Sequence, residues 1–217
     1  MITPDVRSLE TPHGEARLHV RRAHRPVATL LLSHGAGGGV DARDLLALAA
    51  ALPAQGVSVL LLEQPWRVAG RRIATPPATL DAALASAAAT VRSKAPLVVG
   101  GRSAGARSAA RSATALGAVG CLALSFPLHP PGRPEKSRVD ELAASGVPTL
   151  VVQGERDPMG RPEEFPADLE HVDIAVVPAA DHGLKVPARA PLSQDDAMGI
   201  VVESTLEWLV REVLGNR

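Results

Sequence analysis

The fold of this chain is decided by one stretch, Pro96-Leu97-Val98-Val99-Gly100-Gly101-Arg102-Ser103-Ala104-Gly105-Ala106-Arg107. The run Leu97–Val99 is apolar on both faces, follows a proline and ends at glycines, which predicts a buried strand. The alanine-rich, proline-free run from Ala104 to Leu116 predicts a helix. Ser103 therefore lies on a tight turn from strand to helix, and Gly101–Gly105 matches the G-x-S-x-G nucleophile elbow.

The spacing of this motif has a physical reason. An elbow holds its nucleophile in a strained backbone conformation, and the residues two positions before and after it must be small so that strand and helix can approach. The turn also places Ser103 at a helix N-terminus, where the dipole and the free amides favour negative charge. A serine that begins a helix is more often only an N-cap, so the rest of the sequence must show whether Ser103 is a nucleophile.

The composition indicates one soluble domain. A length of 217 residues is sufficient to bury a large core, so we expect a single domain over 1–217. Acidic and basic residues balance at 23 each, so bulk charge gives no reason to expect a nucleic acid or an anionic membrane as a partner. The single cysteine, Cys121, excludes an internal disulfide. Residues 1–5 show no secretory pattern and no apolar run is long enough to span a membrane, so we expect a cytoplasmic protein.

Strand and helix patterns alternate along the chain. We expect a hairpin within 6–22 and later strands at 28–33, 57–62, 97–99, 119–125, 148–153 and 172–177. We expect helices after Asp41, which can cap the first of them, and at 80–92, 104–116, 138–144 and 194–214, with an irregular loop over 63–77. This rhythm predicts an α/β protein whose mostly parallel sheet is covered by helices on both faces. The segment between Ser125 and Pro148 is too short for a separate lid domain.

Polar residues follow two of the later predicted strands, at the sheet edge where ligands of such proteins bind. Asp157 lies in the loop after one strand, and His182 lies in the loop after the next. The order Ser103, Asp157, His182 is a known chain order of Ser-His-Asp triads. His182 can accept the proton of the Ser103 hydroxyl, and Asp157 can fix the tautomer of the imidazole and stabilise the imidazolium. The sequence therefore predicts a catalytic triad.

Two other carboxylates compete with Asp157 for the role of the acid. Asp181 adjoins His182, and adjacent side chains rarely point so that one can support the other. Glu155 lies closer to its strand, and its neighbour Arg156 indicates a local ion pair. Asp157 is therefore the preferred acid, and the other two are the alternatives.

A glycine-rich loop, His34–Gly39, follows the predicted strand 28–33. Acyl transfer requires amides directed at a developing oxyanion, one from the residue after the nucleophile and one from the loop after an earlier strand. Ala104 and Ala36 are the expected donors for this oxyanion hole, with Gly37 as a close alternative to Ala36. A phosphate or dinucleotide cradle is disfavoured, because the loop lacks the P-loop lysine and has Val40 at the final glycine of G-x-G-x-x-G.

Together these segments resemble α/β-hydrolases of the dienelactone-hydrolase-like group. More closely, the chain resembles a small hydrolase-like family that shares its domain with a subunit of a chromatin acetyltransferase complex. The resemblance is carried by Ser33–Gly37, Gly100–Gly105, Phe126–Gly132, Gln153–Pro158 and Ala180–His182. It implies the α/β-hydrolase fold and a serine hydrolase, but no particular substrate. Dienelactone hydrolases have a cysteine nucleophile, whereas this chain has Ser103.

The expected function is hydrolysis of a small ester, thioester or related acyl substrate through an acyl-enzyme on Ser103. We expect no cofactor and no metal, a small-molecule substrate as the partner, and a monomer or homodimer. Some relatives serve as interaction modules, so a catalytically silent binding module is the alternative. An intact Ser, Asp and His set argues against that alternative, because a module without chemistry has no physical reason to keep these residues in order.

Arg102 and His129 are candidate substrate-binding residues. Arg102 adjoins the nucleophile, where its guanidinium can bind an anionic group of the substrate or instead brace a loop carboxylate such as Glu63. His129 lies in a proline-rich loop, where it can line the same pocket or only cap the loop. Both alternatives stay open for each residue.

Overall fold

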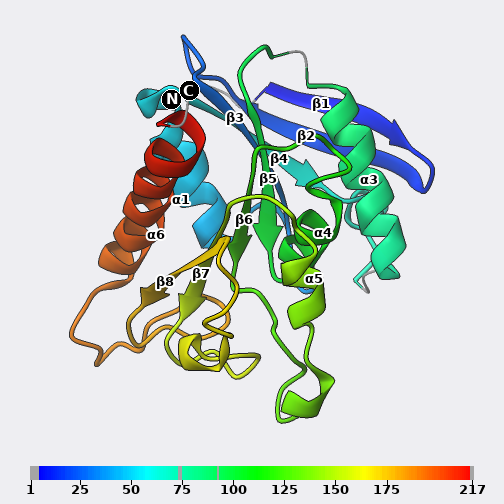
Figure 1. The fold of residues 1–217 in the computed structure, drawn as a ribbon. Coiled ribbons are helices and arrows are strands. Elements are labelled where there is room, and N and C mark those ends of the chain that lie inside the picture. Colours follow the sequence, from blue (N-terminus) through cyan, green and yellow to red (C-terminus); the bar gives the residue numbers. More distant parts are fainter. Residues whose placement is uncertain (1–4, 73–74, 92, 216–217) are drawn as a thin grey trace.

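A single sheet forms the centre of the protein (Figure 1). The computed structural model describes residues 5–72, 75–91 and 93–215, and in these ranges the sheet has eight strands in the order β1-β2-β4-β3-β5-β6-β7-β8. The strands are β1 Asp5–Thr11, β2 Gly14–Arg21, β3 Ala28–Ser33, β4 Val57–Glu63, β5 Leu97–Arg102, β6 Gly120–Leu124, β7 Thr149–Gly154 and β8 Val172–Val177.

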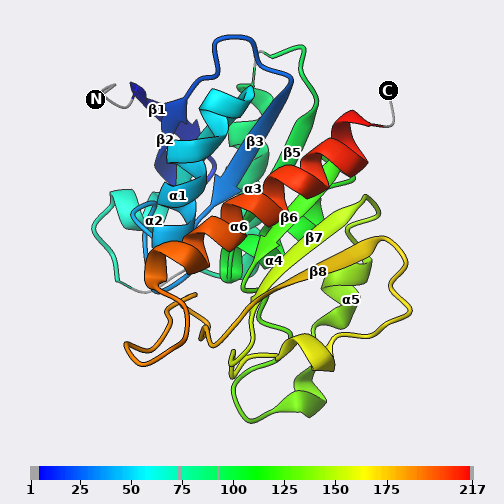
Figure 2. The same cartoon turned by 90° about the vertical axis from the view of Figure 1, so that its left-hand side faces the viewer.

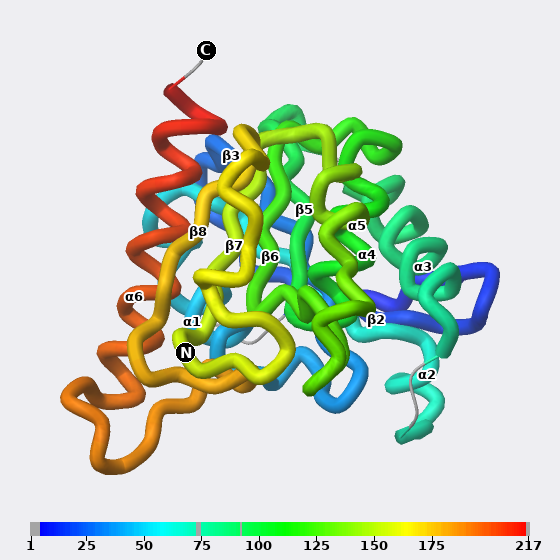
Figure 3. Tube along the Cα trace, turned by 60° about the horizontal axis from the view of Figure 1, so that its bottom comes forward, coloured from blue at the N-terminus to red at the C-terminus, as the bar shows by residue number. Residues whose placement is uncertain are grey.

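Pairing within the sheet is mostly parallel. β1 and β2 form an antiparallel hairpin, β2 pairs antiparallel with β4, and the remaining neighbouring pairs are parallel. The carboxyl ends of β3 to β8 therefore lie at one edge of the sheet, which confirms the predicted architecture. Figure 3 turns this edge toward the viewer and shows the loops after β7 and β8 beside each other.

Helices cover both faces of the sheet (Figures 1 and 2). Alternate side chains of β3 serve the two faces: Leu30 points to the core cluster that includes Trp208, and Leu31 points to the cluster that includes Ala106. One face carries α1 Arg43–Ala51 and α6 Gln194–Trp208, and the other carries α3 Pro77–Ala89, α4 Ala104–Ser112 and α5 Val139–Ala143. The shorter helical segments are α2 Pro65–Val68, the 3-10 turns Leu52–Gln55, Pro134–Lys136 and Pro162–Glu164, and a π-helical continuation of α6 at Leu209–Leu214.

The connection between β6 and β7 contains one 3-10 turn and the short helix α5. The described chain therefore has no separate lid domain, as predicted. In the same described ranges, no helix combines the length and the apolar character needed to cross a membrane.

The glycines on either side of Ser103 allow strand, helix and neighbouring strand to meet. A Cβ atom on Gly101 would lie 2.5 Å from the carbonyl oxygen of Ser33 and 2.7 Å from the backbone of Gly105. A Cβ atom on Gly105 would collide with the same carbonyl of β3. Neither position can carry a larger residue, because the obstacles are backbone atoms. The close approach of β5 and α4 to β3 thus depends on the spacing of the motif.

Several predicted boundaries are wrong. Asp41 does not cap the first helix, which begins at Arg43 with Ala42 as its N-cap. The predicted loop 63–77 contains the short helix α2, which Pro65 begins. The helix after Ser103 ends at Ser112, four residues before the predicted end. The predicted helix end at 92 and residues 1–4, which entered the search for a secretory pattern, lie outside the described residues.

Candidate active site

Ser103 occupies a strained turn between β5 and α4. Its backbone has φ 53° and ψ −113°, a combination with positive φ that residues other than glycine rarely adopt. Such a residue costs about 1–3 kcal/mol and persists only where the surroundings fix it. Here the backbone amide of Ser103 donates to the carbonyl of Leu124, the last residue of β6, at 2.9 Å. The side chain is half-buried, so its hydroxyl is held at the edge of the sheet.

Asp157 lies in the loop after β7 and is fully buried. Its Oδ1 accepts from the backbone amide of Met159 at 2.8 Å, and its Oδ2 accepts from the side-chain amide of Gln153 at 2.9 Å. Gln153, the fifth residue of β7, also donates to the carbonyl of Gly160 at 2.7 Å. The position of Gln153 near the end of β7 was the only sequence signal for this supporting role. These bonds orient the carboxylate before any contact with His182.

His182 joins the other two residues in one hydrogen-bonded chain. Its Nδ1 lies 2.7 Å from Oδ2 of Asp157, and its Nε2 lies 2.9 Å from Oγ of Ser103. The side chain of His182 is 23% exposed, whereas that of Asp157 is 0% exposed. The imidazole thus connects a buried carboxylate to a hydroxyl at the surface. The structure brings together the three residues that the sequence placed in three separate loops.

The two alternative carboxylates lie outside this chain of hydrogen bonds. Asp181 is exposed, and its Oδ1 accepts from the amides of Gly183 at 2.7 Å and Lys185 at 3.0 Å. Glu155 accepts from the amide of Ala179. Both side chains hold the loop that carries His182, and neither contacts the imidazole. The geometry therefore favours Asp157 as the partner of His182.

The glycine-rich loop after β3 lies against the elbow. A Cβ atom on Gly35 would be 3.2 Å from both the Cβ of Ser103 and the carbonyl of Arg102. Ala36 and Gly37 follow at the exposed surface, and Ala104 begins α4 directly after Ser103. Their role as oxyanion donors remains a prediction. It requires the loop after β3 to lie close to the elbow, as it does here.

His34 fixes the start of this loop. Burial lowers the pKa of His34, so the ring is neutral near pH 7. Its Nε2 accepts from the amide of Gln64 at 3.1 Å, so the proton is on Nδ1, which donates to the carbonyl of Gly35 at 2.8 Å. Trp66 packs edge-on against the ring, with 5.2 Å between the centroids. The end of β4 therefore supports the loop that the oxyanion prediction requires.

Arg102 braces the site, with partners other than the one expected. Its Nη2 donates to the backbone carbonyl of His182 at 2.9 Å. Its Nε lies 3.1 Å from Oδ2 of Asp44, an ion pair without the alignment of a hydrogen bond. Glu63, the expected partner, instead contacts His19 at 3.1 Å. The bracing alternative thus describes this side chain better than substrate binding, and sequence alone could not reveal Asp44 as the partner.

Replacing Arg102 with glutamine should lower the free energy of unfolding by about 3–5 kcal/mol, because breaking a buried ion pair leaves an uncompensated charge. Asp44 is fully buried, and burial raises the pKa of its carboxyl. Urea unfolding measures the effect, and Arg25→Gln at an exposed position is the matched control, with an expected change within about 0.5 kcal/mol. The double variant Asp44→Asn/Arg102→Gln should recover part of the loss. Equal stability of Arg102→Gln and the control would contradict a structural role for the pair.

His129 uses both ring nitrogens within its own loop region. Nδ1 lies 2.9 Å from the carbonyl of Pro130, and Nε2 lies 2.9 Å from a carboxylate oxygen of Glu164. The side chain is 7% exposed. These contacts favour the loop-capping alternative over substrate binding.

The contacts of His129 predict a pH dependence of stability. The hydrogen bond to the carbonyl of Pro130, and then the bond to Glu164, raise the pKa of His129 from 6.5. Because the pKa of His129 is higher in the folded than in the unfolded state, its protonation stabilises the fold. This contribution is complete at pH values below the unfolded-state pKa and is lost as the pH rises through the folded-state pKa. The difference in melting temperature between the wild type and His129→Gln should therefore shrink from pH 5.5 to about pH 8. A difference that stays constant over this range would contradict the assignment.

The comparisons with known proteins identify the family. The sequence model of the alpha/beta hydrolase domain family matches residues 26–210, and the chain belongs to this family. No curated protein matches the sequence. The resemblance to the chromatin-complex subunit stays a prediction.

Several solved structures share the fold. The chain is similar to an α/β serine hydrolase without a lid from Xanthomonas campestris, with a TM-score of 0.71, 20% identity and 96% of each chain covered. It is similar to an α/β serine hydrolase homologue from Coxiella burnetii, with a TM-score of 0.75 and 17% identity over 94% of this chain and 98% of that one. It is also similar to a dienelactone hydrolase from Anabaena variabilis, with a TM-score of 0.71 and 16% identity over 97% and 98% of the two chains. At these identities the likeness concerns the fold.

Proposed function

We propose that the protein is a serine hydrolase that cleaves a small ester, thioester or related acyl substrate through an acyl-enzyme on Ser103. The observation that carries the proposal is the hydrogen-bonded chain from Ser103 through His182 to Asp157, with distances of 2.9 and 2.7 Å. Membership of the alpha/beta hydrolase family supports the same reaction class.

Acylation begins with the hydroxyl of Ser103. As Oγ attacks the carbonyl carbon of the substrate, its proton passes to Nε2 of His182. Asp157 accepts from Nδ1 throughout and stabilises the imidazolium. The amides of Ala104 and Ala36, or of Gly37 in place of Ala36, stabilise the oxyanion of the tetrahedral intermediate. When the intermediate collapses, His182 gives its proton to the leaving alcohol or thiol.

Deacylation reverses the roles with water as the nucleophile. His182 takes a proton from a water molecule, whose oxygen attacks the acyl carbon bound to Ser103. Collapse of the second intermediate returns the proton to Oγ and releases the carboxylic acid. The 23% exposure of the His182 side chain allows the required water to approach. Because the described chain lacks a lid domain, the substrate expected here is small and soluble rather than an aggregated lipid.

Fluorophosphonate labelling of the native protein tests the proposal directly. Mass spectrometry should place one adduct on Ser103, and heat-denatured protein should remain unlabelled, because activation of the hydroxyl depends on the folded His182. A panel of short-chain esters and thioesters then identifies the scissile bond. A native protein that neither labels nor turns over any member of the panel would favour the binding-module alternative.

A further inference from the structure

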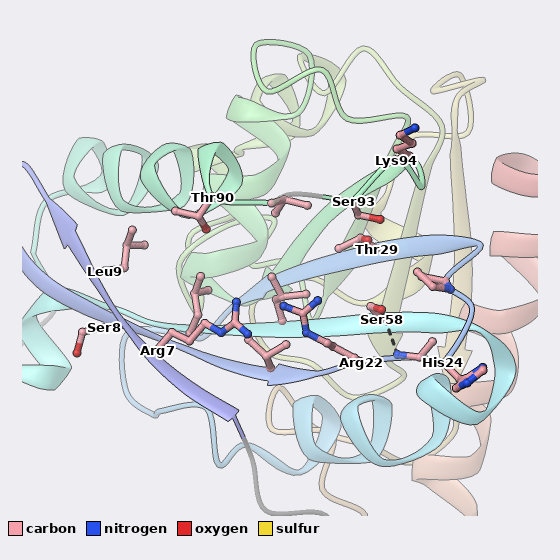
Figure 4. A pocket seen from close by; sticks show the side chains of 16 residues that line it. Arg7, Ser8, Leu9, Arg22, His24, Thr29, Ser58, Thr90, Ser93 and Lys94 are labelled. Atoms are coloured by element: carbon pink, nitrogen blue, oxygen red, sulfur yellow. Dashed lines mark hydrogen bonds between the residues drawn. The ribbon is translucent and has the colours of Figure 1, made fainter.

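Figure 4 shows a cavity of about 560 Å³, which lies at the amino ends of the central strands, whereas Ser103 follows the carboxyl end of β5. Its wall includes Thr29 and Ser58, the second residues of β3 and β4. β3 rises about 3.3 Å per residue, so Thr29 lies about 13 Å from Ser33, where the strand reaches the elbow. The cavity is therefore separate from the proposed active site. Its volume lies within the range of small-molecule sites.

One part of the cavity wall is positively charged. Arg7 and Arg22 line this part, Lys94 lines a different part of the cavity (Figure 4), and none of the described lining residues is acidic. Nε of Arg7 donates to Oδ2 of Asp5 at 2.9 Å. Figure 4 shows Arg7 and Arg22 both extending over the sheet surface. The hydrogen bond from Arg7 lowers the pKa of Asp5, so Asp5 is ionised and pairs with Arg7. Asp5 balances the charge of Arg7, and the charges of Arg22 and Lys94 leave the cavity wall with excess positive charge.

The rest of the wall combines apolar side chains with neutral polar ones, among them Ser58, Thr90 and Ser93. Leu18, Val20 and Leu60 contribute side chains from β2 and β4. Cations beside an apolar surface match a molecule with an anionic head and an apolar body.

We propose that this cavity is a second binding site for a small amphipathic anion, a carboxylate or a phosphate carrying a short alkyl body. The head binds between Arg7 and Arg22, whose guanidinium groups can donate hydrogen bonds to its oxygens. The body covers Leu18, Val20 and Leu60. This site does not depend on the proposed hydrolase activity.

Isothermal titration with octanoate and with octyl phosphate tests the site and distinguishes the two head groups. At least one of them should bind, and octanol and acetate, which lack the head or the body, should bind at least tenfold more weakly. Arg22→Glu and Arg7→Gln, both at exposed positions, should weaken binding of the preferred anion tenfold or more. Arg25→Glu, an equal charge change outside the wall, should leave the affinity within twofold.

Ser103→Ala should also bind the preferred anion as tightly as the wild type, which separates this site from the proposed active site. Circular dichroism and melting temperatures establish that each variant is folded. The proposal is overturned if neither anion binds at millimolar concentration, if octanol binds as tightly as octanoate, or if Arg22→Glu and Arg25→Glu have the same affinity. It is also overturned if Ser103→Ala abolishes binding.

Discussion

Replacing Ser103 with alanine is expected to reduce ester turnover by about 10⁶-fold, the effect seen when a serine nucleophile is removed from a triad. Covalent labelling by fluorophosphonate should disappear completely, because alanine has no oxygen to attack phosphorus. The fold should persist, since the change removes one half-buried hydroxyl and one hydrogen bond to His182. The melting temperature and the rate of turnover are the two measurements required.

Ser108 provides a matched control in the same helix. It is fully buried in α4, and its hydroxyl has no partner among the described residues. Ser108→Ala should therefore leave turnover and labelling unchanged, with a stability within about 1 kcal/mol of the wild type. If Ser103→Ala retains labelling, or if both variants lose it equally, Ser103 is not the nucleophile.

The central strands could be predicted well because they are buried on both faces. A parallel strand covered by helices on both sides reads as a short apolar run closed by a turn residue. The strand Ala28–Ser33 is buried throughout and has the predicted bounds. Val172–Val177 also has the predicted bounds, although it is an edge strand on which only Val177 is fully buried. Helix boundaries were harder. Residues 113–116 contain no glycine or proline, so the sequence gives no signal that the helix ends at Ser112. The short helix α2 depends on tertiary contacts such as that of Trp66 with His34, which the local sequence does not reveal.

The proximity of Ser103, Asp157 and His182 followed from topology. Each residue comes after a strand of a parallel sheet, so the three loops had to meet at one edge. The partner of Arg102 did not follow, because Asp44 belongs to α1 and its burial depends on packing that local sequence does not encode. The same holds for Gln153, whose acceptors come from two separate loops: Phe126 at 3.2 Å follows β6, and Asp157 and Gly160 follow β7.

Asp157→Asn should reduce turnover by about 10⁴-fold through the tautomer of His182. Every group around the carboxylate donates a hydrogen bond to it: His182 at 2.7 Å, Met159 at 2.8 Å and Gln153 at 2.9 Å. An asparagine must place its NH₂ group against one of these donors. If NH₂ faces the imidazole, it donates to Nδ1 and forces the ring proton onto Nε2, where the ring can no longer accept from Ser103.

The loss should appear in kcat and in the rate of fluorophosphonate labelling, measured below the melting temperature of the variant. One unsatisfied buried donor also lowers the free energy of unfolding by about 1–3 kcal/mol. Asp181→Asn is the control nearest to His182: its retained oxygen can still accept from Gly183 and Lys185, so turnover should fall less than tenfold. The assignment is wrong if Asp157→Asn keeps full activity while Asp181→Asn or Glu155→Gln loses it. The carboxylate whose loss abolishes activity would then be the one that fixes the tautomer of His182.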